Sequence, residues 1–316
     1  MSDSDTVPPS DAAQSNDTRI IDAPFPFNRA TADLILRSSD RVDFRVRRGI
    51  PAEASNFFED MFQLPQPAVG RSLEETRDAL PIVDMEEDSS TLERLLRLCY
   101  PAAGNTPKIE NLDDLRRVIR AAIKYAMPQL LDTLKGDLRS FADAYPVRVY
   151  AIALVLKLED EARAAAKAFL AFSILESADA PELAEITGKQ FNNLLKYHRA
   201  CSAKATPVAN QPPWALKRNG NTWFDSHHSG CQRDYVGDYY ASSWWKRYMT
   251  RSAALLETTP SGKALLVDSR IDAALKEAVV DCTTCGRSAP GQMRCFVREF
   301  AQKVDEAVAE VPLVIE

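Results

Sequence analysis

Three pairs of metal-ligand residues stand out in the second half of the chain. Each pair is separated by two residues: His198 and Cys201, His228 and Cys231, Cys282 and Cys285. An imidazole or thiolate three positions from another can bind one ion from a turn or from the start of a helix. The chain has only three histidines and six cysteines, so three such pairs are a stronger signal than one alone.

We predict one structural zinc ion held by His228, Cys231, Cys282 and Cys285, because both pairs lie in polar loops between expected helices. His198 and Cys201 are the alternative pair. They share one face of an amphipathic helix with Leu194, which favours a core histidine with one hydrogen bond and a cysteine acting as a small hydrophobe, although that helix end could deliver the pair to the site. Reduced thiols without metal are the ordinary alternative for all six cysteines, and the spacing does not displace it.

The same region does not resemble an active site. Catalytic zinc needs an open position and a nearby general base, and no residue marks either. The Ser261-Gly-Lys263 sequence lacks the glycine that a phosphate loop carries five residues before its Gly-Lys pair. A redox role for Cys282 and Cys285 would require a strand–helix setting, whereas helices are expected on both sides. We predict that the protein is not an enzyme and needs no cofactor other than the zinc.

Composition narrows the classes of partner. The 316 residues are 45% apolar, with 39 basic and 45 acidic side chains and a net charge of −6. No basic stripe suggests nucleic-acid binding, and no apolar run approaches the roughly 20 residues of a membrane span. The acidic, proline-containing start does not resemble a signal peptide. We expect an intracellular protein, cytoplasmic or nuclear or both, that binds neither nucleic acid nor membrane.

Residues 28–62 form the most regular segment of the first half. In an extended chain Leu34 and Leu36 point to one face, with Asp33, Ile35 and Arg37 on the other. After the turn residues 38–41, Phe44 and Val46 alternate with the charged residues Asp43, Arg45 and Arg47. This period of two predicts a β-hairpin with one buried face. The aromatic-rich segment 52–62 predicts a helix that covers it.

This segment resembles the opening of a BTB domain, also called a POZ domain. The shared residues are Asp33, Phe44, Val46, Ser55, Phe57, Phe58, Met61 and Phe62. Residues 150–162 resemble the following helix in a large set of BTB proteins of the kind abundant in mushroom-forming fungi. The resemblance implies a protein-interaction module, so we expect a non-catalytic scaffold that forms a homodimer.

The expected fold is α+β. A disordered tail (1–26) precedes a BTB domain (27–145) with a third strand at 80–85, and an all-α domain (146–316) follows. Ser90, Asn111 and Thr187 are expected to cap helices. An aromatic helix near 244–256 is expected to form core rather than a groove for a partner.

The resemblance also implies a charged groove at a two-fold dimer interface. Asp33, Arg47 and Arg48 occupy its charged positions, with Phe58 and Phe62 beside them; the family usually has His-Lys where this chain has Arg47-Arg48. A buried Asp33–Arg47 ion pair with a purely structural role is the alternative. Some BTB proteins are adaptors for cullin-class ubiquitin ligases. That function would depend on Phe62 and residues 63–75, and a zinc-dependent binding module is a further alternative.

Overall fold

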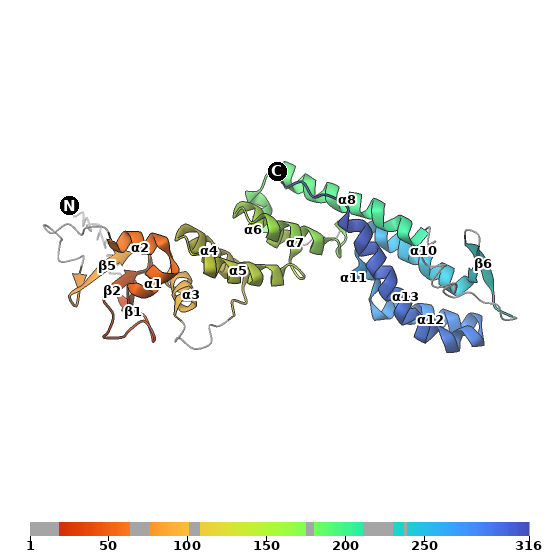
Figure 1. Ribbon diagram of the computed structural model, residues 1–316, viewed down its shortest axis with the longest axis horizontal. Helices are drawn as coiled ribbons and strands as arrows, with labels where there is room; N and C mark the ends of the chain where they lie inside the picture. The colour runs from red at the N-terminus through yellow and green to blue at the C-terminus, as the bar shows by residue number, and fades with distance from the viewer. Residues whose placement is uncertain are drawn as a thin grey trace, which may run out of the picture. The chain divides into compact units, whose positions relative to one another are not determined.

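In the computed structural model, the alternating residues 34–46 form the expected hairpin. The structure describes residues 19–63, 76–100, 108–174, 180–210, 230–236 and 239–315. They belong to two units, Met1–Lys135 and Gly136–Glu316. The first unit contains a small sheet covered by helices and the second is mainly helical, so the α+β prediction is confirmed (Figure 1).

The sheet of the first unit is built around the hairpin, with further strands on both sides of it. Its strands are β1 (Ile21–Asp22), β2 (Leu34–Arg37), β3 (Val42–Val46), β4 (Thr76–Arg77) and β5 (Leu80–Asp84), in the order β1-β3-β2-β5-β4. β2 and β3 pair antiparallel with Leu36 opposite Phe44, whereas β5 runs parallel to β2. The third strand expected at 80–85 is therefore present as β5, which lies between β2 and β4 in the sheet.

The prediction that residues 1–26 are a disordered tail is wrong for the last residues of that range. Ile21 and Asp22 form β1, which pairs in parallel with β3. The physical reason is that Ala23 and Phe27 are buried, and the Phe27 ring packs edge-on against Phe44 with centroids 5.6 Å apart. Residues 1–18 of that tail lie outside the described residues.

The first unit also contains five helices among its described residues. They are α1 (Gly49–Ala54), α2 (Asn56–Gln63), α3 (Ser89–Cys99), α4 (Leu112–Lys124) and α5 (Pro128–Phe141), the last of which continues into the second unit. The single helix expected over 52–62 is two, because Ser55 is extended and its hydroxyl accepts a hydrogen bond from Phe58 N at 3.1 Å. Asn111 caps α4 as expected, but α3 is capped by Asp88 rather than Ser90.

The second unit is built from helices and one hairpin. The elements are α6 (Pro146–Val155), α7 (Glu159–Phe169), the 3-10 helix η3 (Pro181–Glu185), α8 (Gly188–Asn210), β6 (Arg233–Val236), β7 (Tyr239–Ser242), α10 (Ser243–Thr258), α11 (Gly262–Leu265), α12 (Asp268–Asp281) and α13 (Thr283–Ala309). The capping box predicted at the start of α8 is confirmed: Gln190 N donates to Thr187 Oγ1 at 3.2 Å and Thr187 N donates to Gln190 Oε1 at 2.9 Å. The β6–β7 hairpin adds strands to a half expected to be all-α.

The core of this unit lies among α8, α10, α12 and α13, which pack side by side (Figure 1). Trp244 and Trp245 of α10 are buried, and the Trp245 ring meets Phe296 of α13 with centroids 5.7 Å apart. The aromatic helix is therefore core, as expected. Among the described residues, none of the helices combines the length and apolar character needed to cross a membrane.

Candidate functional site

Three cysteine side chains of the second unit converge on one point. The sulfur atoms of Cys231, Cys282 and Cys285 all lie within 4.8 Å of one another. Cys231 and Cys285 are in direct contact, with 3.5 Å between their Sγ atoms. Each sulfur can serve as a thiolate ligand, so the cluster is a candidate site for a thiophilic metal ion.

The junction between α12 and α13 positions two of these sulfurs. Cys282 is extended there, with φ −162° and ψ 127°, and it is the N-cap of α13. Gly286 N donates to the Cys282 carbonyl oxygen at 2.9 Å, which places Cys282 and Cys285 on the same helical turn. A Cβ at Gly286 would lie 2.9 Å from Val279 Cα, so glycine permits the close approach of the two helices.

The third sulfur comes from the start of the hairpin. Cys231 directly precedes β6, and the base of the hairpin is fastened to α10 by a hydrogen bond from Ser243 N to the Gln232 carbonyl oxygen at 3.0 Å. Ser242, at the end of β7, is buried, with its hydroxyl 3.7 Å from Cys285 Sγ and 3.9 Å from Cys231 Sγ. The cluster therefore joins segments far apart in the sequence.

The spacing of the sulfurs suits tetrahedral zinc. A zinc–sulfur distance of 2.3 Å places two thiolates about 3.8 Å apart across a tetrahedral ion. The 3.5 Å contact and the 4.8 Å limit bracket that value. Burial raises the pKa of the Cys285 thiol to about 11, so this group holds its proton in the absence of a metal.

The structure brings together three of the four predicted ligands. His228 lies outside the described residues. The expectation of a polar loop is wrong for Cys282 and Cys285, which begin α13, whereas Cys231 lies in the loop before β6. The expectation of helices on both sides of the Cys282–Cys285 pair is confirmed.

The alternative pair belongs to the core instead. His198 is buried, its Nε2 lies 3.0 Å from the Phe172 carbonyl oxygen, and its ring packs near Phe169. Burial lowers the pKa of His198. Cys201 is fully buried in the hydrophobic core. Neither residue joins the three-sulfur cluster, so the core interpretation accounts for both.

In the first unit, the charged residues of the expected groove pair differently from the prediction. Arg48 N donates to Asp33 Oδ1 at 2.7 Å, and Arg48 Nε lies 3.6 Å from Asp33 Oδ2. Arg47 donates instead to the Thr31 hydroxyl at 2.9 Å. The alternative of a buried Asp33–Arg47 pair is therefore wrong, because Arg48 is the partner and all three groups are exposed.

The two aromatic residues of the expected groove also differ from each other. Phe58 is 1% exposed and stacks on Tyr125 with centroids 5.1 Å apart, so it is a core residue and offers no surface. Phe62 is partly buried and stacks on Phe58. Phe57, which is 44% exposed, is the aromatic side chain of α2 that reaches solvent.

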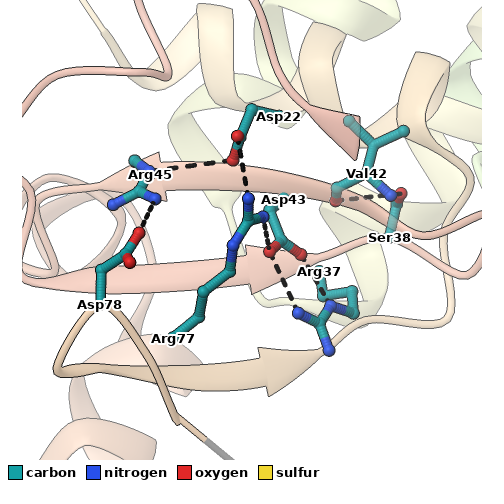
Figure 2. Close-up of polar contacts among 8 residues, drawn as sticks. All are labelled: Asp22, Arg37, Ser38, Val42, Asp43, Arg45, Arg77 and Asp78. Atoms are coloured by element: carbon teal, nitrogen blue, oxygen red, sulfur yellow. Dashed lines mark hydrogen bonds and ion pairs between the residues drawn. The ribbon is translucent and has the colours of Figure 1, made fainter. Parts of the chain in front are cut away.

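A buried ion cluster links four strands and was missed at the sequence level. Asp43 is fully buried and receives hydrogen bonds from Arg37 Nε at 2.6 Å and from Arg77 at 2.7 Å (Figure 2). Arg77 also reaches Asp22 of β1 at 3.0 Å. Burial alone would raise the pKa of Asp43, but the hydrogen bonds from both guanidinium groups outweigh it and lower that pKa. The cluster fastens the edge strands to the hairpin.

The outer strand β1 and the residues on either side of it leave apolar side chains in solvent. Ile20, Ile21 and Phe25 are exposed, and the Arg29 guanidinium lies 5.0 Å above the Phe25 ring. β1 is the terminal strand in the sheet order, so one of its edges pairs with no strand among the described residues. We call Ile20, Ile21 and Phe25 the apolar edge. An edge strand of this kind is a surface on which another chain can pair.

A comparison with family models decides what the first unit is. Residues 26–141, which run from before β2 to the last residue of α5, match the BTB/POZ domain. The chain carries a BTB/POZ domain. BTB domains are protein–protein interaction modules, so Asp33, Arg47 and Arg48 lie on a domain of that class, whereas the apolar edge lies just before the matched residues. A search of curated proteins finds no match to this chain.

Proposed function

We propose that the protein is a non-catalytic scaffold that forms a homodimer through its BTB domain. The observation that supports this most is the apolar edge, because Ile21 on the edge strand β1 and Phe25 in the turn after it are each more than half exposed. A soluble domain gains free energy when such side chains are covered. A second copy presents the same edge, as a two-fold interface requires.

The charged residues of the expected groove contribute to the same proposal. Asp33, Arg47 and Arg48 are exposed beside the hairpin and offer both signs of charge. Phe62 is the aromatic residue of the predicted set that keeps some exposed surface. In the proposed dimer the apolar edge supplies the affinity, and the charges fix the orientation of the two copies.

The apolar edge is tested by charge insertion. In multi-angle light scattering, the wild-type chain should have twice its mass of 35.1 kDa, and Ile21→Asp combined with Phe25→Asp should return it to one. The matched control is Val314→Asp, which adds a charge at an exposed apolar position of the second unit and should leave the dimer intact. A dimer that survives the double substitution would show that the apolar edge is not the interface.

The ligase-adaptor alternative depends on Phe62 and residues 63–75. Of that segment only Gln63 is described, and it is the last residue of α2. Because no observed contact favours binding of a cullin-class protein, we assign no function to this segment.

A second proposed function belongs to the second unit, which we infer binds one zinc ion through Cys231, Cys282 and Cys285. The convergence of three sulfurs within 4.8 Å supports it. His228 as the fourth ligand remains a prediction. Bound zinc would fasten the β6–β7 hairpin to α13, and a two-stranded hairpin is only marginally stable alone. The second unit would then be a zinc-dependent binding module.

Elemental analysis of the purified, untagged chain tests the zinc proposal. We expect one zinc per chain, lost in Cys282→Ser. Cys295→Ser is the matched control, because Cys295 lies exposed on the same helix and outside the cluster. A metal-free wild-type protein after purification in zinc-containing buffer would refute the proposal.

A further inference from the structure

We propose that Cys231 and Cys285 form a disulfide bond when the cluster is metal-free and meets a peroxide oxidant. The inference deepens the proposed zinc function and rests on it for one point only, that metal protects the pair. The cluster would then have two states, one held together by an ion and one by a covalent bond.

The contact between the two sulfurs singles out this pair. Their Sγ atoms are 3.5 Å apart, and a disulfide bond requires about 2.05 Å. The two residues are 54 positions apart and lie on different elements, one before β6 and the other in α13. The sulfurs must therefore approach by about 1.5 Å for the bond to form.

The different exposure of Cys231 and Cys285 indicates which of the two sulfurs reacts first with the oxidant. Cys231 is partly exposed, so a dissolved oxidant reaches it first. Cys285 is 5% exposed and lies beside the buried Ser242 hydroxyl. Cys231 is therefore the sulfur that is oxidised, and Cys285 is the sulfur that resolves the product.

The reaction with hydrogen peroxide balances in two steps. The Cys231 sulfur attacks one peroxide oxygen, the O–O bond breaks, and sulfenic acid and one water form. The Cys285 sulfur then attacks the sulfenic sulfur, the S–O bond breaks, and the Cys285 thiol proton leaves with the hydroxyl group as a second water. Two thiols are oxidised by two electrons, the peroxide is reduced, and Cys282 stays a thiol.

Metal and oxidant compete because they use the same sulfur electrons. A thiolate bound to zinc shares its lone pair with the ion and is less available to peroxide. Oxidation of two ligands would leave Cys282 as the remaining thiolate and release the ion. Occupancy by zinc should therefore slow disulfide formation.

The test uses the full chain after removal of metal with a chelator. Hydrogen peroxide is added, remaining thiols are alkylated, and peptides are mapped by mass spectrometry. We expect one cross-linked species joining Cys231 to Cys285, with Cys282 alkylated. It should still form in Cys282→Ser and in the control Cys295→Ser, and be lost in Cys231→Ser.

The outcomes separate this inference from the zinc proposal. A major link between Cys282 and Cys285, or full alkylation of all three cysteines, would overturn the disulfide. A Cys231–Cys285 link in a chain that binds no zinc would support the disulfide and refute only the zinc. With zinc bound, we expect at least a several-fold slower reaction; an unchanged rate would overturn the competition.

Discussion

The substitution Asp43→Asn removes the carboxylate that bridges Arg37 and Arg77 in the buried cluster (Figure 2). Asparagine has nearly the same shape but no charge, so the change isolates the electrostatic contribution. The Arg37 side chain is 8% exposed and would be left without its counter-ion in the interior. Unfolding of the first unit should become easier for that reason.

The magnitude follows from the burial of each partner. Removing one member of a buried ion pair costs roughly 3–5 kcal/mol, and the Arg37 arm meets that description. Arg77 is 32% exposed, so its arm is screened by solvent and adds at most about 1 kcal/mol. Asparagine still accepts a hydrogen bond, so we expect a loss of about 3 kcal/mol, a large part of the 5–15 kcal/mol typical of a domain.

Hydrogen exchange measured by mass spectrometry is the suitable assay, because all four tryptophans lie beyond residue 210 and fluorescence would report the second unit. Peptides covering β2 and β3 should exchange roughly 100-fold faster in Asp43→Asn, since each 1.4 kcal/mol is about tenfold. Asp78→Asn is the matched control, because Asp78 pairs with Arg45 in the same cluster but is exposed. Equal exchange in the two variants would refute the reasoning.

Further predictions concern acid, packing and the helix junction. Because the pKa of Asp43 is lowered by folding, its contribution to stability is complete above the unfolded value of about 3.9. It should be lost as pH falls through the folded value, which an acid titration followed by exchange in β2 and β3 would show against an Asp43→Asn chain with no such step. Phe58→Ala should cost about 3–5 kcal/mol in urea unfolding and Phe57→Ala much less, since only the first ring is buried; equal losses would contradict the packing. Gly286→Ala should lower the melting temperature of the second unit, because the new Cβ meets the Val279 backbone, and Gly291→Ala should not; an unchanged Gly286→Ala protein would mean that the two helices are farther apart.

The hairpin of the first unit could be predicted because its alternating apolar residues fit one pairing of the two strands. Leu34 and Leu36 on one strand and Phe44 and Val46 on the next require a hairpin with that register. The same period placed Arg37 and Asp43 on a solvent face, and this was wrong. The two residues are directly opposite and neutralise each other, so the sheet can bury them. Cross-strand partners become visible only once the register is known.

The candidate metal site was predictable to the extent that its ligands repeat at short spacing. Cys282 and Cys285 meet because three residues make nearly one helical turn. Cys231 was grouped with them from its spacing to His228, but no predicted element brought it to them. That required the β6–β7 hairpin. Its signal was the Gly237-Asp238 pair between Tyr235 and Tyr240, a dipeptide typical of tight hairpin turns. The groove residue Phe58 was misassigned because aromatic clusters do not reveal which ring is buried.

Native mass spectrometry of the untagged full chain tests the central claim most directly, because it reports subunit number and bound metal together. The account predicts one dominant species at twice 35.1 kDa that carries two zinc ions, one for each chain. A species at 35.1 kDa at micromolar concentration would contradict the dimeric scaffold, and a metal-free mass would contradict the zinc site.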